Sequence, residues 1–218
     1  MRLGKVFTVV VLLGLLGGCA ATSALPGQSF SGSSSPSASP LPSFETVSSA
    51  QFAKAKAAFS VEVDEFNGHS EVYVHPDTSM FFKDESGRAM VVVGITRHDD
   101  KSKWNFNLMT VYGGQEWLFH DTLDLKTENG VFNLTIDDLS RDDQVGNGGS
   151  VSEIAGTNLN DSQIESFCNV ISGRKPKGRL SGTSGGVKEV VGFLPNAGDL
   201  RNGCTIWYGV QNGMKLGS

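Results

Sequence analysis

Apolar and polar residues alternate along much of the segment from residue 91 to 136, and short turn signals divide it. Alternation with a period of two places every second side chain on one face of a strand. Turns are predicted at 113–114 and 129–130 because Gly-Gly and Asn-Gly favour hairpin turns, and Asp-Asp-Lys-Ser at 99–102 predicts a four-residue loop. We therefore predict an antiparallel meander with a buried face made of Val91, Val93, Ile95, Trp104, Phe106, Leu108, Trp117, Phe119, Leu123, Leu125, Phe132, Leu134 and Ile136.

Each turn also predicts a strand register, and apolar residues then face apolar residues across the pair. The predicted pairs are Ile95 with Phe106, Val93 with Leu108, Leu108 with Phe119, Trp104 with Leu123, Leu125 with Leu134, and Leu123 with Ile136. A turn at Asn67-Gly68 predicts a separate hairpin that pairs Val63 with Val72 and Val61 with Val74. His98 and His120 fall at positions that alternate away from the predicted core face.

Two segments have a helical pattern. Residues 48–59 are rich in alanine, with Ser48 or Ser49 as the cap, and residues 160–173 have a helical apolar spacing between Asp161 as the cap and Gly173 as the end. Segments 178–183, 187–194 and 204–210 are predicted to be further strands. The predicted fold class is mainly β (α+β): an antiparallel meander or sandwich-like sheet with one or two packed helices.

The first 18 residues have the organisation of an export signal. Arg2 and Lys5 precede an apolar run of eleven residues, from 6 to 16. A membrane-spanning helix needs roughly 20 apolar residues, whereas a signal peptide needs about 7–15 behind a positive start. The run therefore predicts a signal peptide.

The apolar run ends on Leu16-Gly17-Gly18-Cys19, which resembles the lipobox of bacterial membrane lipoproteins. In that family the cysteine receives a diacylglyceryl group and the signal is cut directly before it. The resemblance implies Leu16, Gly17 and Gly18 as signal-recognition residues and Cys19 as the lipidation site. It also implies a location at the bacterial cell membrane, anchored through lipid on the extracytoplasmic face. The alternative is a plain secretory signal cut near residues 22–24, which leaves no anchor.

Residues 19–44 are predicted to form a lipidated, disordered tether, and residues 45–218 an extracytoplasmic β-rich domain. Eight of the fifteen residues from 29 to 43 are Ser and three are Pro, which is too little apolar surface to order a chain. Removal of the signal takes the formal net charge from −5 to −7. An acidic chain without a dominant charged block argues against a nucleic-acid partner.

With Cys19 assigned to lipid through the resemblance, Cys168 and Cys204 remain. An even number of cysteines in an exported chain predicts one disulfide, which would stabilise the fold by roughly 3–4 kcal/mol in the chain-entropy model. The alternative is two separate buried thiols.

The segment 182–186, Gly-Thr-Ser-Gly-Gly, matches the Gly-x-Ser-x-Gly pattern of serine hydrolases and resembles the serine segment of chymotrypsin-like proteases, with Ser184 as nucleophile. The hydrolase order requires a histidine after the serine, and none follows His120. In the protease family the histidine has a Thr-Ala-Ala-His context, which His69, His75, His98 and His120 all lack, and Thr183 replaces the usual Asp. A Gly-Ser turn between strands is the preferred interpretation, and no catalytic residue is assigned.

No metal or cofactor site is predicted. The acidic segment 136–144 contains Asp137, Asp138, Asp142 and Asp143 but lacks the alternating ligands and closing Glu of a calcium loop. The histidines have no zinc-ligand spacing, and Gly-Asn-Gly-Gly at 146–149 lacks the lysine of a phosphate loop.

The domain resembles exported bacterial lipoprotein domains of unknown function in its Trp-Leu-Phe segment (117–119) and its Arg-Leu-Ser-Gly strand (179–182). The expected function is that of a lipid-anchored, non-catalytic binding or envelope-associated module. Its partner would be an envelope or extracellular protein or a glycan, besides the membrane itself. The alternatives are a small secreted serine hydrolase that uses Ser184, and a purely structural or immunity-type surface lipoprotein.

Overall fold

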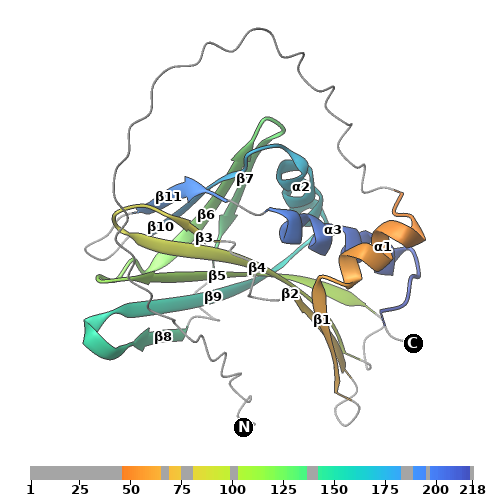
Figure 1. The fold of residues 1–218 in the computed structure, drawn as a ribbon, viewed down its shortest axis with the longest axis horizontal. Coiled ribbons are helices and arrows are strands. Elements are labelled where there is room, and N and C mark those ends of the chain that lie inside the picture. Colours follow the sequence, from red (N-terminus) through yellow and green to blue (C-terminus); the bar gives the residue numbers. More distant parts are fainter. Residues whose placement is uncertain are drawn as a thin grey trace, which may run out of the picture. The chain divides into compact units, whose positions relative to one another are not determined.

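Two antiparallel β-sheets and three α-helices make up the part of the chain that the structure describes (Figure 1). The structure, a computed structural model, describes residues 46–64, 69–74, 81–98, 103–136, 142–182, 189–194 and 197–216. The helices are α1 (Ser49–Lys56), α2 (Asp161–Ser172) and α3 (Gly198–Gln211), with a short 3-10 helix, η2 (Asn147–Gly149).

Within these residues the larger sheet has seven strands and the smaller has four. The larger sheet has the order β1 (Phe59–Asp64), β2 (His69–Val74), β4 (Gly87–His98), β5 (Trp104–Gly114), β9 (Val151–Leu159) and β8 (Asp142–Val145), while β3 (Phe81–Lys83) also pairs with β4. The smaller sheet has the order β11 (Glu189–Phe193), β10 (Lys177–Gly182), β6 (His120–Thr127) and β7 (Gly130–Thr135). The mainly β prediction is confirmed.

The predicted register of one hairpin is confirmed. Strands β4 and β5 pair Ile95 with Phe106 and Val93 with Leu108. The loop at 99–102 itself lies outside the described residues.

Two other hairpins form, but each predicted register is wrong by two residues. Strands β6 and β7 pair Leu123 with Leu134 and Leu125 with Phe132, because Gly130 pairs with Thr127 and the turn consists of Glu128 and Asn129. The Asn129 amide donates to Asn169 O at 3.0 Å and to Ser172 Oγ at 2.9 Å, so contact with α2 holds the turn. A shift of two keeps the same side chains on the buried face.

The N-terminal hairpin shows the same shift. Strands β1 and β2 pair Val61 with Val72 and Phe59 with Val74, and β2 also pairs with β4. The hairpin was predicted to be separate, but this pairing makes it part of the larger sheet. Residues 67 and 68, where the turn was predicted, lie outside the described residues.

The turn predicted at 113–114 does not form. Strand β5 continues through Gly114 and pairs with β9, whereas β6 belongs to the smaller sheet. Residues 115–119 instead cross from one sheet to the other. In this crossing segment Leu118 is fully buried while Trp117 and Phe119 are only partly buried, which reverses the predicted faces.

The segment predicted as a last strand, residues 204–210, lies in helix α3. Leu200, Gly203, Cys204 and Trp207 are all buried and recur at helical spacing. A Cβ atom at Gly203 would lie 2.7 Å from a methyl carbon of Val93, so this glycine allows the helix to approach β4 closely. The β-branched and aromatic residues of the segment favoured a strand locally, but packing on the sheet requires the helical face.

Helix α2 forms where it was predicted, whereas α1 is shorter than the predicted segment 48–59: it ends at Lys56, and Phe59 begins β1. Ser48 caps α1 and shares a capping box with Gln51. Asn160, one residue before the predicted Asp161, caps α2 and shares a capping box with Gln163, and Gly173 ends the helix.

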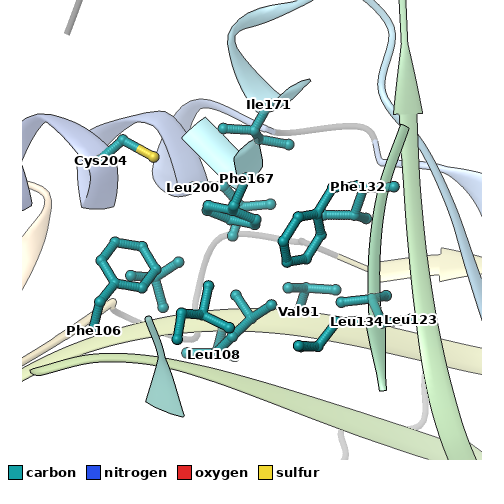
Figure 2. Packing of buried hydrophobic residues seen from close by; sticks show 14 of the residues in the cluster. Val91, Phe106, Leu108, Leu123, Phe132, Leu134, Phe167, Ile171, Leu200 and Cys204 are labelled. Atoms are coloured by element: carbon teal, nitrogen blue, oxygen red, sulfur yellow. The ribbon is translucent and has the colours of Figure 1, made fainter. Parts of the chain in front are cut away.

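The core lies where the two sheets and the helices meet. Figure 2 shows buried side chains from both sheets, α2 and α3 converging on Phe167. The Phe167 ring centroid lies 5.7 Å from that of Phe106 in the larger sheet and 5.4 Å from that of Phe132 in the smaller sheet. The predicted disulfide is confirmed: Cys168 of α2 is bonded to Cys204 of α3, with a Cα–Cα distance of 5.8 Å.

Candidate functional site

The residues predicted for lipid attachment lie outside the described part of the chain. These are Leu16, Gly17, Gly18 and Cys19. Ser184 also lies outside it, whereas Gly182 is described as the last residue of β10. A Cβ atom at Gly182 would lie 1.9 Å from the carbonyl oxygen of Leu118, so close contact with the crossing segment accounts for this glycine.

One polar cluster is buried between the sheets. The Glu153 carboxylate accepts hydrogen bonds from the backbone N–H groups of Leu118 at 2.6 Å, Phe119 at 2.8 Å and His120 at 3.0 Å. It also accepts from His120 Nδ1 at 2.9 Å, and His120 Nε2 lies 2.9 Å from Thr110 Oγ1. We call Thr110, His120 and Glu153 the buried triad.

A β-bulge turns His120 into the core. Ser181 pairs with Thr122 but Gly182 pairs with His120, so Asp121 is an extra residue on β6. An extra residue reverses the alternation beyond it. The prediction that His120 faces away from the core is therefore wrong, because the side chain is 0% exposed. His75 and the side chains of His69 and His98 lie outside the described part of the chain.

The buried triad has the hydrogen-bond order of a catalytic triad: hydroxyl, imidazole, carboxylate. Its members are only 0–1% exposed, so a substrate has no access to the Thr110 hydroxyl in this arrangement. The cluster instead joins β5, β6 and β9 to the crossing segment. Phe119, which has a φ of 48°, is held in this unfavourable conformation by its hydrogen bond to Glu153.

The hydrogen bonds determine the charge state of Glu153. Burial raises the pKa of this carboxyl, but the hydrogen bonds from His120 and from three backbone N–H groups outweigh burial and hold the pKa below its ordinary value. A buried carboxylate with four donors is well satisfied, which is the condition for keeping a charge inside a protein.

A hydrogen bond from Tyr112 also holds the crossing segment. The Tyr112 hydroxyl donates to Glu116 O at 2.8 Å. Burial, followed by the negative charges of Glu153, Glu116 and Asp84, raises the pKa of Tyr112 to about 12. The hydroxyl therefore stays protonated and remains a donor at any physiological pH.

A pocket of about 600 Å³ lies at a different place, between the end of α2, the end of β11 and the start of α3. We call it the basic pocket. It is lined by Lys175, Pro176, Phe193, Leu194, Ala197, Gly198 and Arg201. Pro176, Leu194 and Ala197 are buried, and Leu194 N donates to Pro176 O at 2.9 Å. The interior wall is therefore apolar and held by the backbone.

Arg201 is the half-buried cation of the basic pocket. Its Nε donates to Ile171 O at 2.8 Å and its Nη2 to Gly173 O at 2.6 Å, so it satisfies carbonyl groups at the end of α2. Burial lowers the pKa of the guanidinium, while the charge of Glu128 raises it. Among the described residues no carboxylate lies within ion-pair distance of Arg201.

Further positive charge surrounds the basic pocket. Lys175 and Lys177 are exposed, and Lys177 Nζ lies 5.9 Å from the ring centroid of Phe193. By contrast, Arg179 of the same basic segment forms an ion pair with Asp124. Glu128, whose negative charge raises the pKa of Arg201, accepts a hydrogen bond from Arg174 N at 2.8 Å through each of its carboxylate oxygens.

Two other kinds of site were sought in the described ranges. No group of three or more His, Cys, Asp or Glu side chains there is arranged to hold a metal ion. None of the helices described has both the length and the apolar character needed to cross a bilayer.

Comparison with protein-family models, with curated proteins and with solved structures finds no match to this chain. The arguments about its function therefore rest on its own residues.

Neither the buried triad nor the basic pocket was predicted from the sequence. For the pocket a signal was present: four of the six residues from 174 to 179, Arg-Lys-Pro-Lys-Gly-Arg, are basic in a chain with a net charge of −5. For the triad no signal was visible, because its residues lie on three different strands. The pairing of β5 with β9 brings Thr110 near Glu153, and His120 reaches them from β6 of the smaller sheet.

Proposed function

We propose that the protein is a bacterial membrane lipoprotein, anchored through a diacylated Cys19 on the extracytoplasmic face, whose β-rich domain is a non-catalytic binding module. The observation that carries the proposal is the Leu16-Gly17-Gly18-Cys19 sequence directly after a short apolar run. Two acyl chains suffice for stable membrane attachment, whereas one holds only marginally. The Ser- and Pro-rich residues 29–43 would then separate the domain from the bilayer.

Features of the folded domain support the proposal. A disulfide between Cys168 and Cys204 suits an oxidising compartment outside the cytoplasm. The basic pocket supplies a place for a ligand. The His120 ring uses Nδ1 for Glu153 and Nε2 for Thr110, which favours a non-catalytic role over a hydrolase that depends on this histidine.

Metabolic labelling with radioactive palmitate, followed by membrane fractionation, tests the anchor. We expect the wild-type chain to carry label and to sediment with membranes, and the Cys19→Ser variant to lose both properties. Gly17→Ala is the matched control, since alanine is the more usual residue at this lipobox position and labelling should persist. A soluble, unlabelled mature chain that begins after Ala24 would refute the lipid anchor.

A fluorophosphonate probe tests the non-catalytic part of the proposal. We expect no covalent labelling of the purified chain. Labelling that disappears in the Ser184→Ala variant would establish the serine hydrolase alternative instead.

A further inference from the structure

We propose that the basic pocket binds an oxyanion, a carboxylate or a phosphate, that is attached to an apolar body. This inference deepens the proposed binding role and is independent of the lipid anchor. It depends on three properties of the pocket: unused donors, unpaired positive charge and an apolar wall.

Arg201 provides the donors. A guanidinium has five N–H donors, and the bonds to Ile171 O and Gly173 O use two of them. These two bonds fix the plane of the group at the pocket wall, so its fork is positioned before a ligand arrives. A positioned guanidinium is suited to a planar or tetrahedral oxyanion, which accepts two hydrogen bonds at once.

Positive charge predominates around the pocket, although the Glu128 carboxylate, which accepts from Arg174 N, acts on Arg201 from beyond ion-pair distance. Lys175 lines the pocket and Lys177 lies against Phe193 at its edge. Neither lysine has a carboxylate within ion-pair distance among the described residues, whereas Arg179 has Asp124. In a chain of net charge −5, a local group of three cations around one hollow indicates an anionic ligand.

The wall of the pocket is suited to an apolar group beside the anion. Pro176, Leu194 and Ala197 form this wall. Phe193 is 64% exposed at the edge, which is a large exposure for an aromatic side chain and provides a face for stacking. The volume of about 600 Å³ lies within the range of about 300–1,000 Å³ that small-ligand sites occupy.

A discrete ligand fits this geometry better than an anionic membrane surface. A flat membrane contacts the most exposed lysines, but it cannot place a charged group beside the half-buried Arg201 and an apolar group on the Leu194 wall at the same time. The shared chemistry is an oxyanion on an apolar body, and the experiment separates carboxylate from phosphate.

Saturation-transfer difference NMR on the full mature chain in a non-ionic detergent tests the proposal. The probes are N-acetyl-L-phenylalanine and its neutral amide, which differ only in the carboxylate, together with phenyl phosphate. We expect the acid to bind about ten-fold more tightly than the amide, as is typical for a charged hydrogen-bonded contact. Whichever of N-acetyl-L-phenylalanine and phenyl phosphate binds more tightly shows whether the pocket prefers a carboxylate or a phosphate.

Three variants locate the binding. Lys175→Glu should weaken binding of the anion about ten-fold, and Phe193→Ala should weaken both the acid and the amide. Both side chains are exposed, so neither variant should disturb the fold. Lys103→Glu is the matched control, because it changes the net charge equally at an exposed lysine that does not line the pocket.

Several outcomes would overturn the proposal. Equal affinity for the acid and the amide would show that the pocket does not recognise the oxyanion. An equal loss of affinity in Lys103→Glu would show that only the net charge of the chain matters. No binding of either anion, or binding only to vesicles of anionic phospholipid, would also refute it. Because every probe is measured on one purified chain, these results are distinct from failure of palmitate labelling, which concerns the anchor.

Discussion

The buried triad and the basic pocket use charged side chains in opposite ways. In the triad, the Glu153 carboxylate is 0% exposed and has four hydrogen-bond donors supplied by the protein itself. In the pocket, Arg201 is half-buried and Lys175 is exposed, and no carboxylate of the described residues pairs with either.

The comparison shows that hydrogen-bond saturation and access distinguish a structural cluster from a binding site better than residue type does. The triad contains the residues expected of an enzyme, but its polar groups satisfy one another and exclude substrate. The pocket contains residues common on any surface, but among the described residues its cations have no carboxylate within ion-pair distance, as the proposed anion site requires.

Removal of the Glu153 carboxylate should have the largest effect. Glu153→Ala leaves three backbone N–H groups and His120 Nδ1 without their acceptor, which should lower the free energy of unfolding by about 3–5 kcal/mol. Urea denaturation followed by circular dichroism measures the loss. Glu165→Ala, at an exposed position of α2, should change stability by less than about 0.5 kcal/mol. Similar values for the two variants would contradict a structural role for the triad.

Loss of the disulfide should come next, at about 3–4 kcal/mol for the Cys168→Ala/Cys204→Ala double variant. This bond joins α2 to α3, and α3 supplies Gly198 and Arg201 to the basic pocket, whereas the triad is held by the sheets. Hydrogen exchange should therefore show lost protection in α3 and retained protection at Leu118, Phe119 and His120. An unchanged unfolding midpoint after reduction of the wild-type chain would contradict the prediction.

The stability should also depend on pH through Glu153. Its folded-state pKa lies below the ordinary value of 4.5, so the folded state binds its proton less tightly than the unfolded state does. The contribution is therefore present above about pH 4.5 and is lost as the pH falls through the folded-state pKa, with a slope of at most about 1.4 kcal/mol per pH unit for one proton. Urea denaturation between pH 7 and pH 3 should show a flatter profile for Glu153→Gln than for the wild type. Parallel profiles would show that other carboxyl groups produce the dependence.

Removal of the Thr110 hydroxyl should have a smaller effect. Thr110→Val leaves His120 Nε2 without its partner and should cost about 1–3 kcal/mol. Thr157→Val provides a matched control, because Thr157 Oγ1 is buried without a hydrogen-bond partner in the described part of the chain. The same substitution there should be neutral or stabilising, as thermal denaturation can show. Equal destabilisation by both variants would indicate a general cost of valine on these strands.

Lys175→Glu should have the smallest effect on stability, within about 0.5 kcal/mol, because the side chain is exposed. The same variant is expected to lose anion binding. Loss of anion binding without loss of stability would give the sharpest contrast with Glu153→Ala. A large loss of stability would show that Lys175 helps to hold the fold, as Glu153 does.

The local pattern predicted strands and faces better than it predicted pairings. Leu123, Leu125, Phe132 and Leu134 were placed on the buried face and are buried, although the register of β6 and β7 is shifted by two residues. Alternation depends only on the backbone period, so it survives such a shift. The register depends on the turn, and here contacts between Asn129 and α2 hold that turn.

Errors concentrate where a distant segment overrides the local preference. Residues 115–119 cross between the sheets because Glu153, which is distant in sequence, accepts hydrogen bonds from the N–H groups of Leu118 and Phe119 and from that of the next residue, His120. Residues 204–210 form a helix because Gly203 permits close packing on Val93 and Cys204 is bonded to Cys168. Glu153, Val93 and Cys168 are all too far away in sequence to appear in the short windows from which local structure is predicted.

Sequence patterns were enough to predict the mainly β class, the buried faces of the long strands, the Ser48 cap of α1 and the end of α2 at Gly173. With Cys19 assigned to lipid, they also predicted the bond between Cys168 and Cys204. These features follow from periodicity, capping and cysteine count, which act locally or are simple to count. The tertiary structure decided that there are two sheets, that His120 is buried beside Glu153, and that Arg201 meets Lys175 at one pocket. Such features depend on side chains that strand pairing and helix packing bring together. The free energy of burying or exposing a charge depends on the neighbouring groups and on solvent access, which only the tertiary structure sets.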